Sequence, residues 1–310
     1  MHSVAILGAN GQDGSYLCEI EADAGRRVLA IGRQPAYAWE PPRGEFHYHQ
    51  LDVSDQQALR GFLNEQEPDS IFHVAAVHGA AGFTYEPVVE QLFAVSVTSV
   101  HSCLEYLRER GNGQLFYASS AKVFGASLTG NIDESSPRRA DCLYSAAKIA
   151  ASNLIDYYRR DHQVSAVVAY LFNHESRRRP PEFFVPTIAR ALAGGLAGAQ
   201  TKEVIKTLDF HADWGSAREY MELVSKAMRV GLNEDLVIGT GNTVYAADAV
   251  NELFAAHGLD YRDYLEVAAE AAQGGPAPFH ANVERLAASV GGKPATGFRL
   301  LVEDIAGVPA

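Results

Sequence analysis

A tyrosine and a lysine four residues apart are the most suggestive chemical pair in the chain. Tyr144 and Lys148 lie at the start of the predicted helix LYSAAKIAASNLIDYYRR, and their spacing places both on one helix face. A phenol titrates near pH ~10, and a neighbouring ammonium lowers that pKa by favouring the phenolate. Ser119 and Ser120 end the predicted strand QLFYASS and can donate hydrogen bonds to a substrate oxygen. Together these residues form a candidate proton-transfer set for hydride chemistry at a carbinol.

The beginning of the chain has the pattern of a nucleotide-binding turn. Apolar residues 4–7 predict a strand, which leads into three spaced glycines and then a helix. Gly8 would permit the tight turn, Gly11 would let the backbone approach a pyrophosphate, and Gly14 would allow close packing of helix on strand. The helix N-terminus would direct its free N–H groups at the phosphates. The candidate cofactor ligands in this turn are Gly8, Gly11, Gln12, Asp13 and Gly14.

Strands that alternate with helices predict an α/β fold, a Rossmann-type doubly wound parallel sheet covered by helices on both faces. We expect strands at 4–7, 28–31 and 46–51 and in IFHVAAVHG, QLFYASS and VSAVVAYLFN, with long helices over 87–110 and 144–160. Ligands bind at the carboxyl ends of such strands. The candidate ligands expected there are Arg33, Asp52, Val53, Ala75 and Ala76 for a cofactor, and Ser119 and Asn173 for a substrate.

The pattern changes after residue 174, where HESRRRPPEFF is polar and broken by prolines. We predict a cofactor-binding domain over 1–174 and a smaller C-terminal substrate-binding region over 175–310, which can return elements to the main sheet. Helices are expected at 184–193, 216–230, 246–257 and 264–272, and short strands in EVIKTL and LVIGTG.

Composition and charge exclude several classes of protein. The chain has 310 residues, 47% of them hydrophobic, and a net charge of −12, which argues against nucleic acid or an anionic membrane as a partner. No signal peptide and no membrane-spanning apolar run is apparent. The three cysteines match no metal spacing, and we expect no metal site and a reducing cytoplasmic location.

Arg33 and two histidines refine the expected site. An arginine after the second strand suits a 2′-phosphate, so Arg33 favours NADP, with NAD as the alternative. His78 follows the small residues expected against the cofactor and is a candidate substrate ligand. His174 and Glu175 are poor evidence for a metal, and we expect His174 to help position the backbone near the cofactor.

In five segments the chain resembles the extended short-chain dehydrogenase/reductases, most closely the GDP-mannose 4,6-dehydratase branch. They are GANGQDGSYL, ASSAKVFG, LYSAAK, LFNHES and ADWGSAREYM, and they span Gly8 to Met221. The resemblance implies tightly held NADP and a nucleotide-diphosphate sugar substrate. It also implies a homodimer or higher homo-oligomer, in which the helices near 90–110 and 144–160 form the interface.

The resemblance further implies an order of reaction. Tyr144 takes the proton of the sugar's 4-hydroxyl while hydride passes to the nicotinamide, and Ser120 polarises the 4-oxygen. Lys148 lowers the tyrosine pKa and can hold the nicotinamide ribose. Water is then eliminated across carbons 5 and 6, and hydride returns to carbon 6.

One departure from the family concerns the residue that performs elimination. The family segment S-T-S-E-L-Y-G carries a glutamate as acid/base where this chain has Lys122, and several related dehydratases have an aspartate where it has Ala121. A lysine can remove the acidified proton beside a ketone if burial lowers its pKa. Lys122 could instead serve an epimerase, or hold the substrate of a simple reductase.

Two further departures remove arginines that the resemblance expects to grip the substrate diphosphate. The family's R-D-W-G is here Ala212-Asp213-Trp214-Gly215, and its R-P-T-E motif has become GGPAPF near 274–279. At about 1.5–3 kcal/mol for each charged hydrogen bond, both losses together would cost several kcal/mol. Either the run Arg177, Arg178 and Arg179 replaces them, with Arg178 and Arg179 our candidate substrate ligands, or the substrate is of another class.

Three hypotheses follow from these residues. The first is a 4,6-dehydratase-type lyase with internal hydride recycling, in which the catalytic residues are Ser120, Lys122, Tyr144 and Lys148. The second is a keto-sugar reductase or an epimerase on the same scaffold. The third is a non-catalytic dinucleotide sensor, against which the retention of Tyr144 and Lys148 argues.

Overall fold

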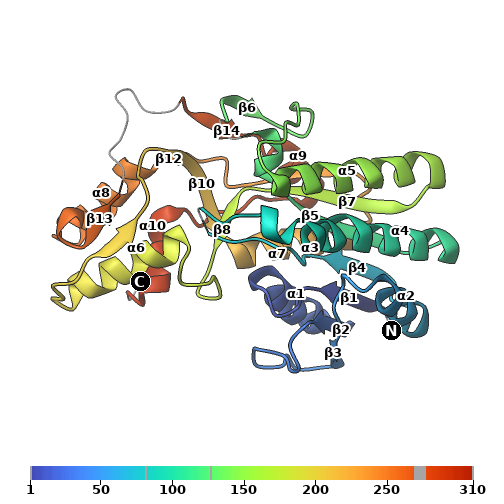
Figure 1. Ribbon diagram of the computed structural model, residues 1–310. Helices are drawn as coiled ribbons and strands as arrows, with labels where there is room; N and C mark the ends of the chain where they lie inside the picture. Colours follow the sequence, from blue (N-terminus) through green and yellow to red (C-terminus); the bar gives the residue numbers. More distant parts are fainter. Residues whose placement is uncertain (1, 81, 126–127, 269–276, 309–310) are drawn as a thin grey trace.

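A seven-stranded sheet forms the centre of the molecule (Figure 1). The computed structural model describes residues 2–80, 82–125, 128–268 and 277–308. All neighbouring strands of this sheet pair in parallel, which confirms the predicted α/β fold. Their spatial order is β11 (Asp235–Ile238), β7 (Ser165–Leu171), β5 (Gln114–Ser120), β4 (Ser70–His73), β1 (Ser3–Leu7), β2 (Arg27–Gly32) and β3 (Phe46–Gln50).

Helices cover the sheet on both sides, so its central strands are buried on both faces. Every residue of β1 and β4 is buried, as expected for a sheet packed between two helical layers. One layer contains three helices, α1 (Gln12–Asp23), α7 (Ala217–Arg229) and α9 (Glu284–Val290). In it, α7 packs between α1 and α9. In the other, α4 (Ser99–Arg110) packs between α2 (Gln56–Gln66) and α5 (Leu143–His162).

The helix predicted over 87–110 forms without a break, but its type changes along its length. The chain forms a 3₁₀ turn at Glu86–Val88, then α3 (Val89–Phe93), a π turn at Ala94–Thr98, and α4. Side chains compete with the helical ladder at the π turn, because Ser99 Oγ donates to the carbonyl of Val95 and Thr98 Oγ1 donates to that of Phe93.

A second hydrophobic core lies in the C-terminal region. It is built on β10 (His211–Ser216), which pairs with β8 (Asn173–Glu175) and β12 (Thr243–Tyr245). Three helices pack on it, α6 (Phe184–Leu196), α8 (Ala246–Ala256) and α10 (Phe298–Ala306). Two small parallel pairs complete the described strands: β9 (Glu203–Ile205) with β13 (Leu265–Val267), and β6 (Gly130–Ile132) with β14 (Phe279–Ala281).

The C-terminal region contributes to both cores. Residues of β11, α7 and α9 belong to the core of the main sheet, so a single cut at 174 does not separate the two cores. The helix predicted over 264–272 is wrong in its first part, because Leu265–Val267 pairs with β9 as a strand. The remainder, 269–272, lies outside the described residues.

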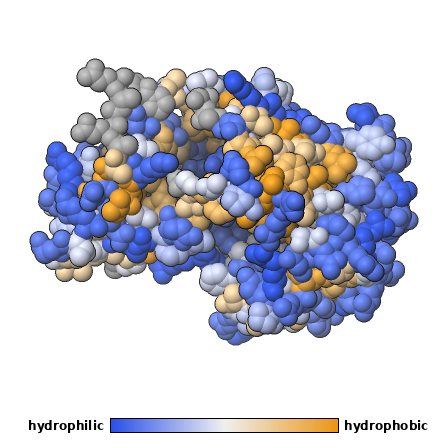
Figure 2. All heavy atoms as spheres, viewed as in Figure 1, coloured by the Kyte–Doolittle hydropathy of each residue, from blue (hydrophilic) through white to orange (hydrophobic). Residues whose placement is uncertain are grey.

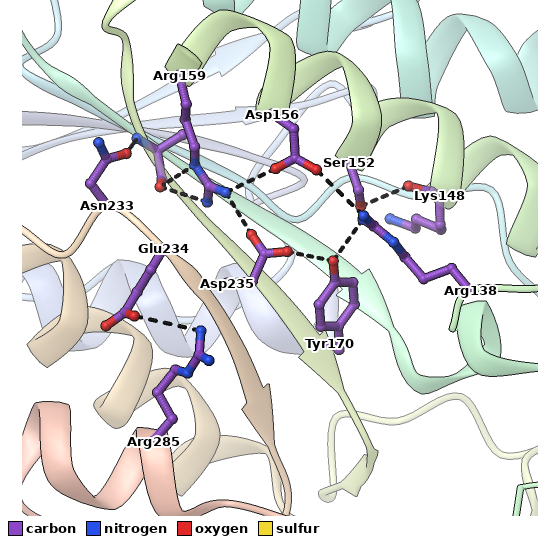
Figure 3. Close-up of polar contacts among 11 residues, drawn as sticks. Arg138, Lys148, Ser152, Asp156, Arg159, Tyr170, Asn233, Glu234, Asp235 and Arg285 are labelled. Atoms are coloured by element: carbon purple, nitrogen blue, oxygen red, sulfur yellow. Dashed lines mark hydrogen bonds and ion pairs between the residues drawn. The ribbon is translucent and has the colours of Figure 1, made fainter. Parts of the chain in front are cut away.

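A polar network fixes the helix that carries Tyr144 and Lys148. Figure 3 shows this network. The hydroxyl of Tyr170 on β7 donates to Asp235 on β11 at 2.6 Å and accepts from Arg138 at 2.9 Å. Arg159 on α5 donates to the other oxygen of Asp235 at 2.6 Å. The network therefore ties α5 to two strands of the sheet and to the loop before the helix.

The helices of the described chain include none that is both long and apolar enough to cross a lipid bilayer.

Candidate active site

One cavity of about 700 Å³ lies at the carboxyl ends of the central strands. Loops after β1, β2, β3, β4, β5 and β7 all reach it, and so does the first part of α5. The predicted site residues that line it are Gly8, Gly11, Gln12, Asp13, Gly14, Arg33, Val53, Ala75, Ala76, His78, Ser119, Ser120, Lys122, Tyr144, Lys148, Asn173, His174 and Arg179.

The glycine turn is as tightly constrained as a dinucleotide cradle requires. Gly8 has φ +97°, and a Cβ there would lie 2.8 Å from the backbone of Ala75. A Cβ on Gly14 would overlap the carbonyl oxygen of Gly8 and lie 2.8 Å from Cα of Ala9. Glycine at both positions lets the turn pack against the segment after β4 and lets α1 begin directly against the turn. The N-terminus of α1 therefore lies at the cavity, a geometry that fits a pyrophosphate.

A partly buried ion pair joins the glycine turn to β8. Nε2 of His174 lies 3.1 Å from both carboxylate oxygens of Asp13, and its Nδ1 donates to the carbonyl of Phe172. Burial acts against both charges, but their mutual attraction and hydrogen bond lower the pKa of Asp13 and raise that of His174. Gln12 also donates to the carbonyl of His174. These polar side chains therefore hold α1 against β8 at the floor of the cavity.

Tyr144 and Lys148 are both buried, and burial dominates their titration. Nζ of Lys148, which is 1% exposed, donates to the carbonyl of Ala118 at 2.6 Å, and burial lowers its pKa to about 7. Burial, with a contribution from Tyr85, raises the pKa of Tyr144, and a hydrogen bond with Ser120 lowers it only in part. Removal from water disfavours both charges and sets the direction of both shifts, and the expectation that Lys148 lowers the tyrosine pKa stays a prediction.

This titration predicts a pH dependence of stability. The folded pKa of Lys148, about 7, lies below the ~10.4 of an unfolded lysine, so the folded state binds fewer protons between these values. The free energy of unfolding should then increase with pH above 7, by up to about 1.4 kcal/mol per pH unit from this group. We expect Lys148→Met to remove that increment from urea unfolding curves of cofactor-free protein.

The exposed Lys226→Met on α7 is the matched control and should keep the wild-type slope. Equal slopes for wild type and Lys148→Met would contradict the assignment.

Comparison with known proteins identifies the family. The sequence profile of the GDP-mannose 4,6 dehydratase family matches residues 5–285, which include the glycine turn, Tyr144 and Lys148. The chain belongs to this family. Among curated relatives, GDP-mannose 4,6 dehydratase 1 of Arabidopsis thaliana is 28% identical over 280 residues, covering 84% of this chain and 76% of the relative. The Homo sapiens GDP-mannose 4,6 dehydratase is 27% identical over 262 residues, covering 80% and 70%.

Solved structures share the fold over nearly the whole chain. The dTDP-glucose 4,6-dehydratase of Bacillus anthracis, in complex with NAD, superposes with a TM-score of 0.81 at 17% identity, covering 99% of this chain and 96% of its own. The UDP-glucose 4-epimerase of Thermus thermophilus, in complex with NAD, gives 0.80 at 20% identity, covering 99% and 100%. The solved structures therefore show a Rossmann-type fold, and the family match makes this chain an enzyme of the GDP-mannose 4,6 dehydratase family.

Two predicted ligands lie outside the cavity lining. Arg178 forms an ion pair with Glu19, donates to Ser15 Oγ at 2.9 Å and stacks on Tyr16. These contacts turn it towards α1, and its role as a substrate ligand stays a prediction. Asp52 likewise does not line the cavity, because its carboxylate turns back to accept hydrogen bonds from the backbone and hydroxyl of Ser54.

The arginine run only partly replaces the missing clamps. Arg177 pairs with Asp304 on the surface, whereas Arg179 lines the cavity, 3.2 Å from Glu175 and over the ring of Phe183 at 3.8 Å. Ala212 is buried in the second core, so that position presents no side chain to a ligand. The segment 274–276 of GGPAPF lies outside the described residues.

The cavity also contains Lys122, the residue to which the sequence analysis assigned the elimination step. Lys122 lines it from a 3₁₀ turn (Ala121–Phe124), and its backbone N–H donates to Ser120 Oγ. Its side chain is exposed. Ser119 Oγ is buried without a hydrogen-bond partner among the described residues, which leaves it free for a ligand.

Sequence reasoning missed part of the cavity wall. Glu182, Phe183, Phe184 and Phe210 line it but carry no motif, and Tyr85 stands behind His78. The polar, proline-broken segment before Phe183 was the one sequence signal near this wall. Among the described residues, no group of three histidine, cysteine or carboxylate side chains is arranged to bind a metal.

Proposed function

We propose that this chain is an NAD(P)-dependent sugar-nucleotide-modifying enzyme, a 4,6-dehydratase-type lyase with internal hydride recycling. The observation that carries the proposal is one cavity that combines the glycine turn with Ser120, Lys122, Tyr144 and Lys148. The turn would hold the dinucleotide pyrophosphate, while Tyr144 and Lys148 would lie at its reactive end.

Each catalytic residue has a role that its position supports. Ser120 would donate to the sugar's 4-oxygen, and Tyr144 would take the proton of the 4-hydroxyl. The bound dinucleotide would supply a hydride acceptor that later returns the hydride. Lys122, exposed at the cavity, would remove and return protons during elimination of water. Ser119, His78, Asn173 and Arg179 line the same cavity and would contact the substrate.

We propose NADP as the cofactor. Arg33 is exposed and lines the cavity directly after β2, where an adenosine ribose would lie. We expect Arg33→Ala to weaken NADP binding by about 10–100-fold, the loss of one charged phosphate contact, and to leave NAD binding nearly unchanged.

Fluorescence titration of purified protein with each dinucleotide measures this difference. The neighbouring exposed Arg43, which does not line the cavity, provides the control Arg43→Ala. Equal losses for NADP and NAD would mean that Arg33 does not read the 2′-phosphate.

The test of the reaction begins with mass spectrometry of small molecules released from denatured protein, followed by a panel of nucleotide sugars. Loss of water without added reductant supports the lyase. The second candidate, a reductase or epimerase, is favoured by the exposure of Lys122 and by Ala121 in place of an acid. Steady consumption of NADPH would indicate the reductase, and solvent deuterium uptake without loss of water would indicate the epimerase. If the protein keeps a bound dinucleotide but turns over none of these sugars, the result would indicate the non-catalytic sensor.

We also propose a homodimer built on α5 and its neighbour α4. Figure 2 shows hydrophobic residues gathered over α5, where Ile149 and Leu154 are only partly buried and Tyr157 is 44% exposed. Light scattering of wild type and Tyr157→Glu tests it, with the variant expected to shift towards monomer. A cytoplasmic location stays a prediction; the free thiols of Cys18, Cys103 and Cys142 are compatible with it.

A further inference from the structure

A histidine and a tyrosine in the loop after β4 form a pair directed at the reactive end of the cavity. Nδ1 of His78 lies 2.7 Å from the hydroxyl oxygen of Tyr85. The His78 ring lies 4.7 Å from the Tyr144 ring, centroid to centroid, and lines the cavity. Tyr85 is 8% exposed and does not line it. Tyr85 therefore supports His78 from behind, and His78 stands next to the proposed base.

The hydrogen-bond partners decide which nitrogen of His78 carries the proton. Among the described residues, Nδ1 of His78 is the one acceptor within hydrogen-bond distance of the Tyr85 hydroxyl. Burial raises the pKa of Tyr85 to about 12, so the phenol keeps its proton and donates it to Nδ1. The imidazole proton must then lie on Nε2, for which the described residues supply no hydrogen-bond partner.

The surroundings of His78 keep its ring neutral. Burial lowers the pKa of His78 to about 3, and the charges of Lys122, Arg179, Lys148 and His174 act in the same direction. The His78 ring is also next to the hydroxyl of Tyr85 and to the ring of Phe183, whose centroid lies 5.9 Å from its own. A base with this titration binds no proton near neutral pH, but its N–H remains a good donor to an oxygen.

We propose that His78 is a catalytic hydrogen-bond donor, its Nε2–H directed at a substrate oxygen beside Tyr144, and that Tyr85 is the positioning residue that fixes its tautomer. The inference rests on the proposed function for the identity of the substrate, a sugar whose carbonyl or hydroxyl oxygen accepts the bond. No proton is transferred, so the group stabilises negative charge on that oxygen without titrating.

Nitrogen NMR of histidine-labelled full-length protein with added NADP tests the tautomer without any turnover. His78 is assigned by the loss of its signal in His78→Gln. We expect protonated Nε2, unprotonated Nδ1 and no titration between about pH 5 and 8, and we expect Tyr85→Phe to abolish the preference. Titration of wild-type His78 near its ordinary pKa, or a proton on Nδ1, would overturn the proposal even if no substrate were known.

Kinetics on the sugar nucleotide found active in the panel tests the donor. His78→Phe should lower kcat by about 10²-fold, His78→Gln, which keeps an N–H donor, should recover most of it, and Tyr85→Phe should lose about 3–10-fold. The dinucleotide Kd should not change, and the exposed His47→Gln serves as a control. Full kcat in His78→Phe would refute the donor role. Absence of any wild-type substrate would refute the proposed function instead and leave the NMR result to decide.

Discussion

Replacement of Tyr144 by phenylalanine is expected to lower kcat by about 10²–10⁴-fold, the usual contribution of a positioned acid–base group. The substitution removes only the hydroxyl and leaves the ring, which packs among His78 and Tyr85. The ring is 7% exposed, so the variant should keep its fold and its dinucleotide affinity. Loss of kcat with an unchanged dinucleotide Kd is the expected signature, measured by turnover and by titration on the same preparation.

Tyr157→Phe is the matched control for this change. It lies on the same helix α5, but its side chain is 44% exposed and outside the cavity, and full turnover is expected. Turnover of Tyr144→Phe at the wild-type rate would remove Tyr144 from the mechanism and, with it, the reason to assign Lys148 beside it.

The second large effect is expected at the glycine turn. Gly14→Ala places a methyl group onto the carbonyl oxygen of Gly8 and 2.8 Å from Cα of Ala9, both parts of rigid backbone. The N-terminus of α1 must then move, and the Asp13–His174 ion pair with it. We expect a loss of about 1–3 kcal/mol in the free energy of unfolding and a loss of dinucleotide affinity of about 10²-fold or more.

Gly61 offers a control for the same substitution in another helix. It lies in α2, and an added Cβ there meets no atom within 4 Å. Gly61→Ala should therefore stabilise the protein slightly, by about 0.5–1 kcal/mol, through the loss of backbone freedom in the unfolded chain. Urea unfolding and dinucleotide titration of both variants measure the contrast, and an intact cofactor site in Gly14→Ala would show that the turn does not hold the pyrophosphate.

The sheet was predictable because its signals are local. Five of the six predicted strands are short apolar runs followed by glycine or polar residues, and the sixth, 46–51, mixes polar and apolar residues. Each lies in the sheet within one or two residues of the expected place except IFHVAAVHG, whose strand ends at His73. The seventh strand, β11, joins from the C-terminal region by pairing with β7, which depends on contacts between residues far apart in sequence. The π turn in the helix predicted over 87–110 was missed because the pattern of apolar residues hardly changes when one helical turn widens.

Charge pairing was the part of the site that local pattern could not resolve. The run Arg177, Arg178 and Arg179 reads as three equivalent cations, yet each meets a different carboxylate, on α10, α1 and β8 respectively. Of the three, only Arg179 lines the cavity. Lys122 and Lys148 show the same dependence, since one lies exposed on a turn and the other is buried against β5.

The sequence by itself determined the cofactor turn, the Tyr144–Lys148 pair and the strands whose ends present them, because each depends on spacing within one strand or helix. The tertiary structure alone decided protonation and access. Burial lowers the pKa of Lys148 and raises that of Tyr144, and the folded chain places Tyr85 behind His78. Both pKa shifts arise where separate segments exclude water from one another. Desolvation depends on neighbours brought together by folding, so no spacing along the chain predicts it.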